Sequence, residues 1–447
     1  MIDRRAFLGA AASAAVLAMA PEATALGRTP LGGKVTLHVP WAVSWLDPHD
    51  PRDPLAAIFA GAIADSIFAL EANGTPYPTL AAAMPARENG ETVVRLREGL
   101  RTARLVPLDA RDLVHSVERA RGRGAEAATA EIPRAVPHKT DPLAVVFKGI
   151  DPHHLARLLA SPLLALLPRK FSPTSPDGTG AFRADASAAG LMLTRNLSAA
   201  RGPAFLDAVE VLPGDGLSAS LRAFEAERDD VGWLGLGLHD PRKGAVRFDF
   251  GRVAWVVLVV SADAGAASAS GGAQRLCDAI PSEKLAHLAL GAGPAAGGDP
   301  GWTGPSVDLL VDEGAPHLLE VARAVGPILS RPGHEVTVAP VPRGELLRRK
   351  VKGKAWLSIE IVRPAGPSPA QWLASLAGAE DPARARELAS APPKLANGAS
   401  PRSLTSGLRA GVLGEVRVAG GAVADLMLAR AAEGWDLGAS FRRTPRR

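Results

Sequence analysis

The sequence predicts an α/β fold, and two observations support this prediction. Segments with the two-residue hydrophobic period of a strand alternate along the chain with segments that have the 3.6-residue period of a helix. The chain also has 447 residues, of which 47% are hydrophobic and 22% charged, so it can build a large core and is not wholly disordered. At roughly 150 residues per domain, this length corresponds to about three domains or to one large body with two lobes.

The first 25 residues have the pattern of an export signal. Residues 4–8 (Arg-Arg-Ala-Phe-Leu) precede an alanine-rich apolar run, and residues 23–25 (Ala-Thr-Ala) supply the small side chains that signal peptidase recognises. The order Arg-Arg-x-Phe-Leu is similar to a twin-arginine signal, although Asp3 and Gly9 depart from it, and an ordinary secretion signal is the alternative. The apolar run is shorter than the roughly 20 residues of a membrane span, and no cysteine follows it for a lipid anchor. We therefore expect an exported, soluble, periplasmic protein without a lipid anchor, beginning near Leu26.

The first half of the mature chain is expected to start with a strand. Residues 34–40 (Lys-Val-Thr-Leu-His-Val-Pro) alternate with period two, which is typical of a strand. Apolar residues recur at helical spacing over residues 53–70, and Asp109 is a suitable N-cap for a helix over residues 109–123. The other elements expected here are strands at residues 92–96 and 143–147 and an amphipathic helix at residues 153–167.

The second half is expected to hold the most buried strand and a βαβ-like unit. Residues 253–260 form an unbroken apolar run, which favours burial on both faces of a sheet. Residues 262–272, rich in alanine, serine and glycine, are interpreted as a crossing between lobes. Strands at residues 307–311 and 335–338 enclose a helix at residues 316–329, and residues 354–362 form another strand. Residues 391–406 are expected to be a loop and return crossing.

The charged residues and the single cysteine exclude several classes of protein. The 51 Lys and Arg exceed the 46 Asp and Glu by only five, and the densest basic cluster, residues 343–354, has the spacing of a solvated amphipathic helix. A nucleic-acid partner is therefore not expected. Cys277 is the only cysteine, which excludes an intramolecular disulfide and any multi-cysteine metal site, and we expect it in the core.

Catalytic motifs are absent from the sequence. It contains no Gly-x-Ser-x-Gly, no His-Glu-x-x-His and no Gly-x-x-x-x-Gly-Lys segment, so we expect no enzyme, no catalytic residues and no cofactor. Asp47, His49, Asp50 and Asp53 together could hold a cation. Prolines interrupt that segment, however, and we favour a polar loop that caps the following helix over a metal site.

Seven short motifs in a fixed order carry a resemblance to a known family. They are residues 46–48 (Leu-Asp-Pro), 74–81 (Gly-Thr-Pro-Tyr-Pro-Thr-Leu-Ala), 96–99 (Leu-Arg-Glu-Gly), 110–116 (Ala-Arg-Asp-Leu-Val-His-Ser), 178–182 (Gly-Thr-Gly-Ala-Phe), 195–196 (Arg-Asn) and 202–209 (Gly-Pro-Ala-Phe-Leu-Asp-Ala-Val). In this order they resemble the family 5 extracellular solute-binding proteins, the peptide, nickel and sugar receptors of ABC importers. The chain is a divergent and short member by this comparison.

The resemblance implies a bilobal periplasmic-binding-protein fold with a discontinuous first lobe and a hinge-linked second lobe. It places the first lobe in residues 26–262, including a small subdomain at about residues 50–170, and its C-terminal return in residues 416–447. The second lobe would span residues 263–415. Such a protein captures a small solute in the cleft between its lobes, acts as a monomer, and delivers the solute to an ABC permease in the inner membrane.

The resemblance also points to ligand-binding residues. Trp41 and Trp45 flank the Leu-Asp-Pro loop, and Trp372 follows the segment at residues 363–369 (Arg-Pro-Ala-Gly-Pro-Ser-Pro), where receptors of this family commonly have an acidic loop. We add Arg363, whose guanidinium suits a carboxylate or phosphate. The remaining candidates are the polar residues Ser44 and Thr179.

The absence of the acidic loop affects both the charge expected of the ligand and the expected function. A buried ammonium group needs a paired carboxylate, and only Asp47 and Glu360 remain as substitutes. We therefore expect a neutral or anionic, partly apolar solute rather than a peptide held by its free amino terminus. The alternative is a receptor-derived sensor, scaffold or carrier protein that no longer serves transport.

Overall fold

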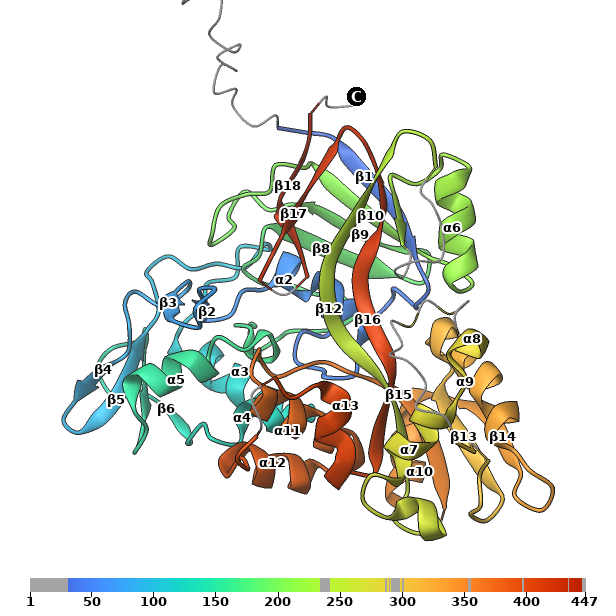
Figure 1. Cartoon of the computed structure of the whole chain (residues 1–447). Coiled ribbons are helices and arrows are strands. Elements are labelled where there is room, and N and C mark those ends of the chain that lie inside the picture. Colours follow the sequence, from blue (N-terminus) through green and yellow to red (C-terminus); the bar gives the residue numbers. More distant parts are fainter. Residues whose placement is uncertain are drawn as a thin grey trace, which may run out of the picture.

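A ten-stranded mixed sheet organises the computed structural model of the protein (Figure 1). Its strands, in order across the sheet, are β14 (Val336–Val341), β13 (Val307–Asp312), β15 (Trp356–Val362), β12 (Ala245–Val260), β16 (Ala410–Val423), β11 (Val231–Trp233), β1 (Lys34–Val39), β10 (Ala208–Pro213), β9 (Gly190–Arg195) and β8 (Phe182–Ser187). The structure describes residues 31–233, 242–285, 288, 290, 298–299, 301–352, 355–395, 398–432 and 434–443. The export signal expected in residues 1–25 lies outside them.

Two long antiparallel strands join the two ends of this sheet. β12 has 16 residues and β16 has 14, and they run side by side through the middle of the molecule in Figure 1. β12 pairs with β15 through Trp255 to Val260, whereas β16 pairs with β11 through Gly420 to Ala422. The predicted bilobal α/β fold is therefore confirmed, with β12 and β16 passing from one lobe to the other.

The second lobe is built around β13, β14 and β15. β13 pairs in parallel with both neighbours, and α9 (Pro316–Leu329) connects β13 to β14, which confirms the predicted βαβ unit. The apolar half of β12, Val253 to Val260, is buried throughout because helices cover the sheet on both sides. The other helices of this lobe are α7 (Gly272–Ala279), α8 (Ser282–Leu285) and α10 (Arg343–Lys352). Cys277 is buried in α7, as expected, and burial raises the pKa of its thiol.

The first lobe holds the other end of the sheet. β1 pairs in parallel with β10, and β8, β9 and β10 form an antiparallel meander. α6 (Leu217–Glu225) packs beside β1 and β11, and α2 (Pro54–Ile63) packs against the C-terminal hairpin of β17 (Leu426–Arg430) and β18 (Trp435–Arg442). The C-terminal segment thus returns to the lobe in which the described chain begins.

A smaller unit with its own core lies beside the first lobe, at the left of Figure 1. Its core side chains come from residues 67–166, with Ala365 from the segment after β15 added to them. Its elements are β2 (Phe68–Leu70), β3 (Pro76–Pro78), β4 (Ala86–Glu88), β5 (Glu91–Arg95), α3 (Ala110–Gly122), α4 (Glu126–Thr129), β6 (Ala135–Pro137), β7 (Ala144–Phe147) and α5 (Pro152–Leu158). It contacts the helices α11 (Pro369–Glu380) and α12 (Pro382–Ser390) through α4, and α13 (Pro401–Leu404) packs on α11.

Two of the predicted helices are shorter than expected. The helix expected over residues 53–70 ends at Ile63, because the Ile63 carbonyl accepts from Gly180 N (3.0 Å) and Asp65 N donates to Thr179 Oγ1 (3.1 Å). The residues that follow then form β2 instead of continuing the helix. The helix expected over residues 153–167 ends at Leu158, before Pro162 starts a 3₁₀ turn.

Most other predicted elements agree with the structure, and two segments expected to be loops contain short helices or turns. The strands expected at residues 34–40, 92–96, 143–147 and 307–311 are confirmed, as is the Asp109 cap of α3. Residues 262–272 form a 3₁₀ turn and the start of α7, and the loop expected at residues 391–406 contains α13. Neither segment is the crossing between lobes expected there, because β12 and β16 connect the two ends of the sheet. No helix within the described residues is long and apolar enough to cross a membrane.

Candidate functional site

The loop that follows β1 lies where the two lobes touch, and we call residues 40–53 the junction loop. Its first residues bond to the second lobe through the main chain. Ala42 N donates to Gly314 O (3.2 Å), and His317 N at the start of α9 donates to Pro40 O (3.2 Å). The junction loop therefore links the carboxyl end of β1 to the amino end of α9, which is where ligands of open α/β sheets are commonly bound.

Aromatic side chains gather at this contact. The indole of Trp41 is 2% exposed and meets Trp233 edge to face, with ring centroids 5.8 Å apart, and His317 at 6.4 Å. Within the described part of the chain, Trp41 Nε1, Trp45 Nε1 and His317 Nδ1 are buried without a hydrogen-bond partner. Burial lowers the pKa of His317 to about 4, so its imidazole is neutral at pH 7. The result is an apolar wall that carries unused N–H donors.

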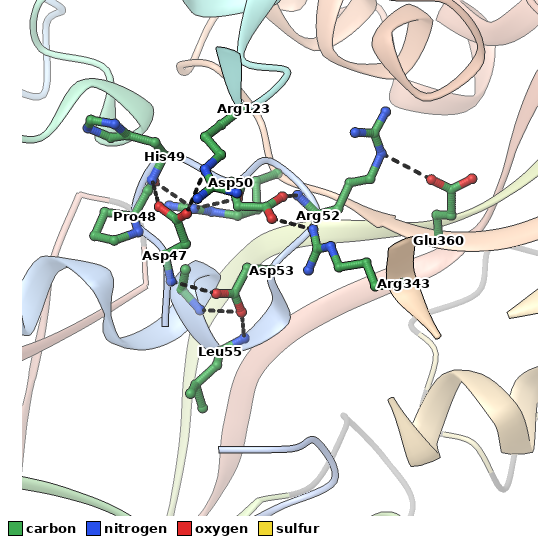
Figure 2. Close-up of polar contacts among 12 residues, drawn as sticks. Asp47, Pro48, His49, Asp50, Arg52, Asp53, Leu55, Arg123, Arg343 and Glu360 are labelled. Atoms are coloured by element: carbon green, nitrogen blue, oxygen red, sulfur yellow. Dashed lines mark hydrogen bonds and ion pairs between the residues drawn. The ribbon is translucent and has the colours of Figure 1, made fainter. Parts of the chain in front are cut away.

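The other half of the junction loop is charged (Figure 2). Asp47 is fully buried and accepts from Arg119 Nη1 and Nη2 of α3 at 2.7 and 2.8 Å, while Arg123 Nε lies 3.3 Å from it. Burial alone would raise the pKa of Asp47, but the hydrogen bonds and charge of Arg119 outweigh it and lower that pKa. Asp47 therefore fixes the loop to the small unit rather than facing a cleft.

Ion pairs join the junction loop to the second lobe. Arg52 Nε donates to Glu360 Oε2 of β15 at 3.1 Å, and Asp50 pairs with Arg343 of α10, as Figure 2 shows. Lys350 Nζ pairs with the other oxygen of Glu360. Burial would raise the pKa of Glu360, but Lys350 and Arg52 outweigh it and lower that pKa, so this buried carboxylate is ionised.

Asp53 and His49 complete the loop. Asp53 caps α2, since its Oδ1 accepts from Leu55 N (2.9 Å) and Ala56 N (3.1 Å). Burial, with Asp50 nearby, raises the pKa of Asp53 to about 7. His49 Nε2 lies 2.8 Å from Ala165 O, and burial lowers its pKa to about 3. The prediction of a polar loop that caps the next helix is confirmed. Among the residues that the structure describes, no group of three or more His, Cys, Asp or Glu is arranged to hold a metal ion.

The structure brings four of the six candidate ligand-binding residues onto or against the junction loop. Trp41, Ser44 and Trp45 belong to it, and the Arg123 guanidinium stacks on Trp45 at 5.8 Å. Arg363 is 3% exposed and contacts the loop from the end of β15. Its Nη1 donates to Pro48 O and to Asp50 O, both at 2.9 Å, and its main-chain N donates to Pro51 O at 2.8 Å.

The other two candidates have partners elsewhere. Thr179 is buried and donates to Asp65 Oδ2 (2.9 Å) in the first lobe. Trp372 of α11 packs against Trp255 with ring centroids 6.2 Å apart, and the Arg252 guanidinium lies over both rings at 4.7 and 4.6 Å. Sequence reasoning did not identify Trp233, His317, Arg52 or Arg343, because nothing in a single sequence shows that these separated residues meet.

Three spaces surround the junction. Between the junction loop and the end of β15, near Pro51 and Arg363, only about 20 Å³ remains. A second cavity of about 170 Å³ lies on the other side of Arg363, beside Trp435. An open groove of about 600 Å³ separates α9 from the start of α6 and is lined by Lys284 and Arg323. The cavity beside Trp435 had no signal in the sequence, because its walls come from six separate segments.

Comparisons with known proteins identify the fold. No family model and no curated protein matches the sequence. The structure matches the pheromone receptor PrgZ with 14% identity over 93% of this chain and 100% of that chain, at a TM-score of 0.68. It matches the periplasmic binding protein DppA from Helicobacter pylori, in complex with the peptide STSA, with 14% identity over 93% of this chain and 99% of that chain, at a TM-score of 0.68. It also matches NikA from Brucella suis, in complex with Fe(III)-EDTA, with 16% identity over 92% of this chain and 100% of that chain, at a TM-score of 0.63. These matches cover nearly the whole of each chain and confirm the expected bilobal binding-protein fold.

Proposed function

We propose, on the premise that the chain has the fold of the solute-binding proteins of ABC importers, that it captures a small solute between its lobes and delivers it to an ABC permease in the inner membrane. The observation that carries this proposal is the match over 93% of this chain and 99–100% of two binding proteins. The protein would act as a periplasmic monomer, exported by the signal in residues 1–25. The family resemblance places the first lobe in residues 26–262 and 416–447 and the second lobe in residues 263–415. We propose instead that the boundaries lie inside β12 and β16, because Trp255 to Val260 of β12 pair with β15 of the second lobe.

Binding of this kind needs no covalent chemistry. A solute that contacts both lobes stabilises the closed arrangement by its differential affinity for that state. The junction loop fits such a role because one end carries buried indole N–H donors and the other end is bonded to both lobes. We therefore propose a binding protein rather than an enzyme.

The contacts at the junction also support the proposed ligand class, a neutral or anionic and partly apolar solute. Asp47 and Glu360 were the carboxylates that could have received a peptide ammonium group. Both are paired with cations of the chain itself, Asp47 with Arg119 and Glu360 with Arg52 and Lys350. Calorimetry with free and N-acetylated di- to pentapeptides tests this: tight binding that acetylation abolishes would contradict it.

A thermal-unfolding screen against a broad solute library tests the proposed function. A solute at a hundredfold excess over its Kd stabilises the native state by about 2.7 kcal/mol, which is a measurable rise in Tm. We expect at least one hit from the library or from periplasmic extract. No hit in either, with a correctly folded protein, would contradict the proposal.

One observation favours the second candidate, a receptor-derived sensor, scaffold or carrier. The junction loop is bonded directly to β15 and α10, and only about 20 Å³ is left between the loop and the end of β15. A protein held closed by its own ion pairs would need no solute to present its closed surface to a partner. Permease and ATPase genes beside the gene would favour transport, and their absence would favour this candidate.

A further inference from the structure

The cavity beside Trp435 has walls from both lobes. α2 and the C-terminal hairpin of the first lobe supply most of its lining, among it Gly61, Trp435 and Leu437. Arg363 and Pro364, which follow β15, close the cavity on the side of the second lobe. Ligand sites occur preferentially where domains meet. A solute in this cavity would contact both lobes, as the proposed function requires.

The cavity also lies against the part of β12 where the pairing with β16 is irregular. The register shifts between Asp249 and Arg252 and again between Arg252 and Ala254. Val253, inside the second of these intervals, lines the cavity, and pairing of β12 with β15 begins at Trp255. Irregular pairing bends a strand locally. A change in the angle between the lobes would therefore alter the shape of the cavity.

The inner wall of the cavity is apolar. It is formed by Trp435, Val253, Ile58 and Leu437, and each of these side chains is itself largely buried. Trp435 Nε1 donates to Ser440 Oγ (2.9 Å), so the indole presents only its apolar surface to the cavity. These walls suit the hydrocarbon part of a ligand.

The charged groups around the cavity are bonded within the chain. Arg201 forms an ion pair with Asp65 at 3.8 Å. Asp436 Oδ1 accepts from Ala439 N (3.0 Å), and Arg363 Nη1 donates to two carbonyl groups of the junction loop, both at 2.9 Å. Two arginines are thus matched by two aspartates. An ionic ligand would lose its hydration without gaining a free counter-ion among these residues, so the site favours an uncharged ligand.

The volume limits the size of that ligand. The cavity holds about 170 Å³, and an apolar protein cavity of about 150 Å³ accommodates benzene. A single six-membered ring with one small substituent therefore fits, whereas a tripeptide does not.

We propose that this cavity is the solute site and that it binds an uncharged, largely apolar solute of the size of one six-membered ring. The inference rests on the proposed function and deepens it, because it narrows the ligand class to neutral solutes and moves the site from the indole donors of the junction loop to the far side of Arg363. Arg363 bonds to the junction loop and also lines the cavity, so the site is continuous with the contact between the lobes.

Two residues of α2 provide a direct test by filling the cavity. Ala57 and Gly61 both line it and lie one helical turn apart, and a Cβ built on Gly61 would meet no atom within 4 Å. We expect calorimetry to show that phenol and cyclohexanol bind the wild type, and that each binds Gly61→Leu and Ala57→Leu at least tenfold more weakly. Gly122→Leu is the matched control, because this glycine at the end of α3 is equally open and lies outside the lining. Its Kd for both probes should stay within twofold of wild type.

The charge of the ligand is tested separately. Benzoate and benzylamine, which carry a negative and a positive charge on a similar ring, should bind at least tenfold more weakly than phenol. Arg201→Gln should leave the Kd of phenol within twofold of wild type, because an uncharged ligand does not depend on this guanidinium, whose side chain is 55% exposed. Tighter binding of benzoate than of phenol, or a tenfold loss of phenol affinity in Arg201→Gln, would contradict the uncharged ligand class.

Circular dichroism and Tm without ligand establish that each variant is folded. Binding of neither neutral probe to the wild type, or binding that both leucine substitutions in α2 leave unchanged, would overturn the inference. A library hit whose affinity is insensitive to both substitutions would leave the proposed function standing and refute this site, whereas no hit of any kind would refute both.

Discussion

Arg52 of the junction loop donates to Glu360 of β15, with Nε and Oε2 3.1 Å apart, although the two residues are 308 positions apart in the sequence. The pair joins the first lobe to the second. Glu360 also accepts from Lys350 and from Ser358 Oγ, so the hydrogen bonds of this carboxylate are made within the chain and not to a cationic ligand. The contact between the lobes is thus made by the chain's own ion pairs.

Arg52→Gln should loosen this contact. The Glu360 side chain is 4% exposed, and removing one of its two cationic partners should cost about 1–3 kcal/mol in the free energy of unfolding. Urea denaturation measures this loss. Arg384→Gln is the matched control, because it removes an exposed pair with Glu387 and should change the stability by less than about 0.5 kcal/mol. Equal effects of the two substitutions would mean that the Arg52–Glu360 pair adds nothing.

Asp47→Asn should be the most damaging change in the junction loop. Asp47 is fully buried, and its loss leaves the largely buried Arg119 without its bidentate partner. Removing one member of such a pair costs about 3–5 kcal/mol. The comparison is Asp185→Asn, which removes an exposed partner of Arg104 and should change the urea midpoint little. A small effect of Asp47→Asn would show that the Asp47–Arg119 pair does not hold the loop.

The lowered pKa values of His317 and His49, about 4 and 3, predict a loss of stability in acid. Below pH 6.5 the unfolded chain binds protons on these residues while the folded protein does not, so the free energy of unfolding falls by up to about 1.4 kcal/mol per pH unit for each histidine. Asp53 acts in the opposite direction, because its pKa of about 7 means that the folded state gains stability as the pH falls from 7 towards 4.

His317→Phe separates these contributions. The phenyl ring keeps the edge-to-face packing on Trp41 and replaces a ring whose Nδ1 has no partner among the described residues. We expect the variant to lose less stability than the wild type between pH 6.5 and 4.5, with a similar or higher Tm at pH 8. Identical pH profiles by urea denaturation would contradict a neutral, buried His317.

Thr179→Val tests whether Thr179 serves the fold or the ligand. Its hydroxyl donates to the buried Asp65 and accepts from Asp65 N. Losing both bonds should cost about 1–3 kcal/mol in stability. If the role is structural, the Kd of any library hit stays within twofold of wild type at a temperature where the variant is folded. A loss of affinity without a loss of stability would instead support its place among the ligand-binding residues.

Local patterns in the sequence predicted the helices and strands well, but they did not predict the contacts between these elements. The alternation at residues 34–40, the Asp109 cap and the apolar run at residues 253–260 each depend on neighbouring residues and agree with the structure. The early end of α2 depends instead on Gly180, more than a hundred residues away, whose N–H donates a hydrogen bond to the Ile63 carbonyl.

In the candidate site, too, local motifs were predicted from the sequence and long-range contacts were not. Motif order placed Trp41 and Trp45 beside the Leu-Asp-Pro loop and Arg363 in the segment where relatives have an acidic loop. The structure places all three on or against the junction loop. The pairs Asp50–Arg343 and Arg52–Glu360, by contrast, join residues about 300 positions apart, and one sequence carries no information on such pairings.

The most direct test of solute capture between two lobes is small-angle X-ray scattering of Arg52→Gln with and without the solute that gives the largest rise in Tm. The variant should be more expanded than the wild type without solute, because the interlobe ion pair is lost. Saturating solute should then reduce its radius of gyration towards that of the wild type. A scattering profile that the solute leaves unchanged, although it raises Tm, would contradict closure of the lobes around a ligand.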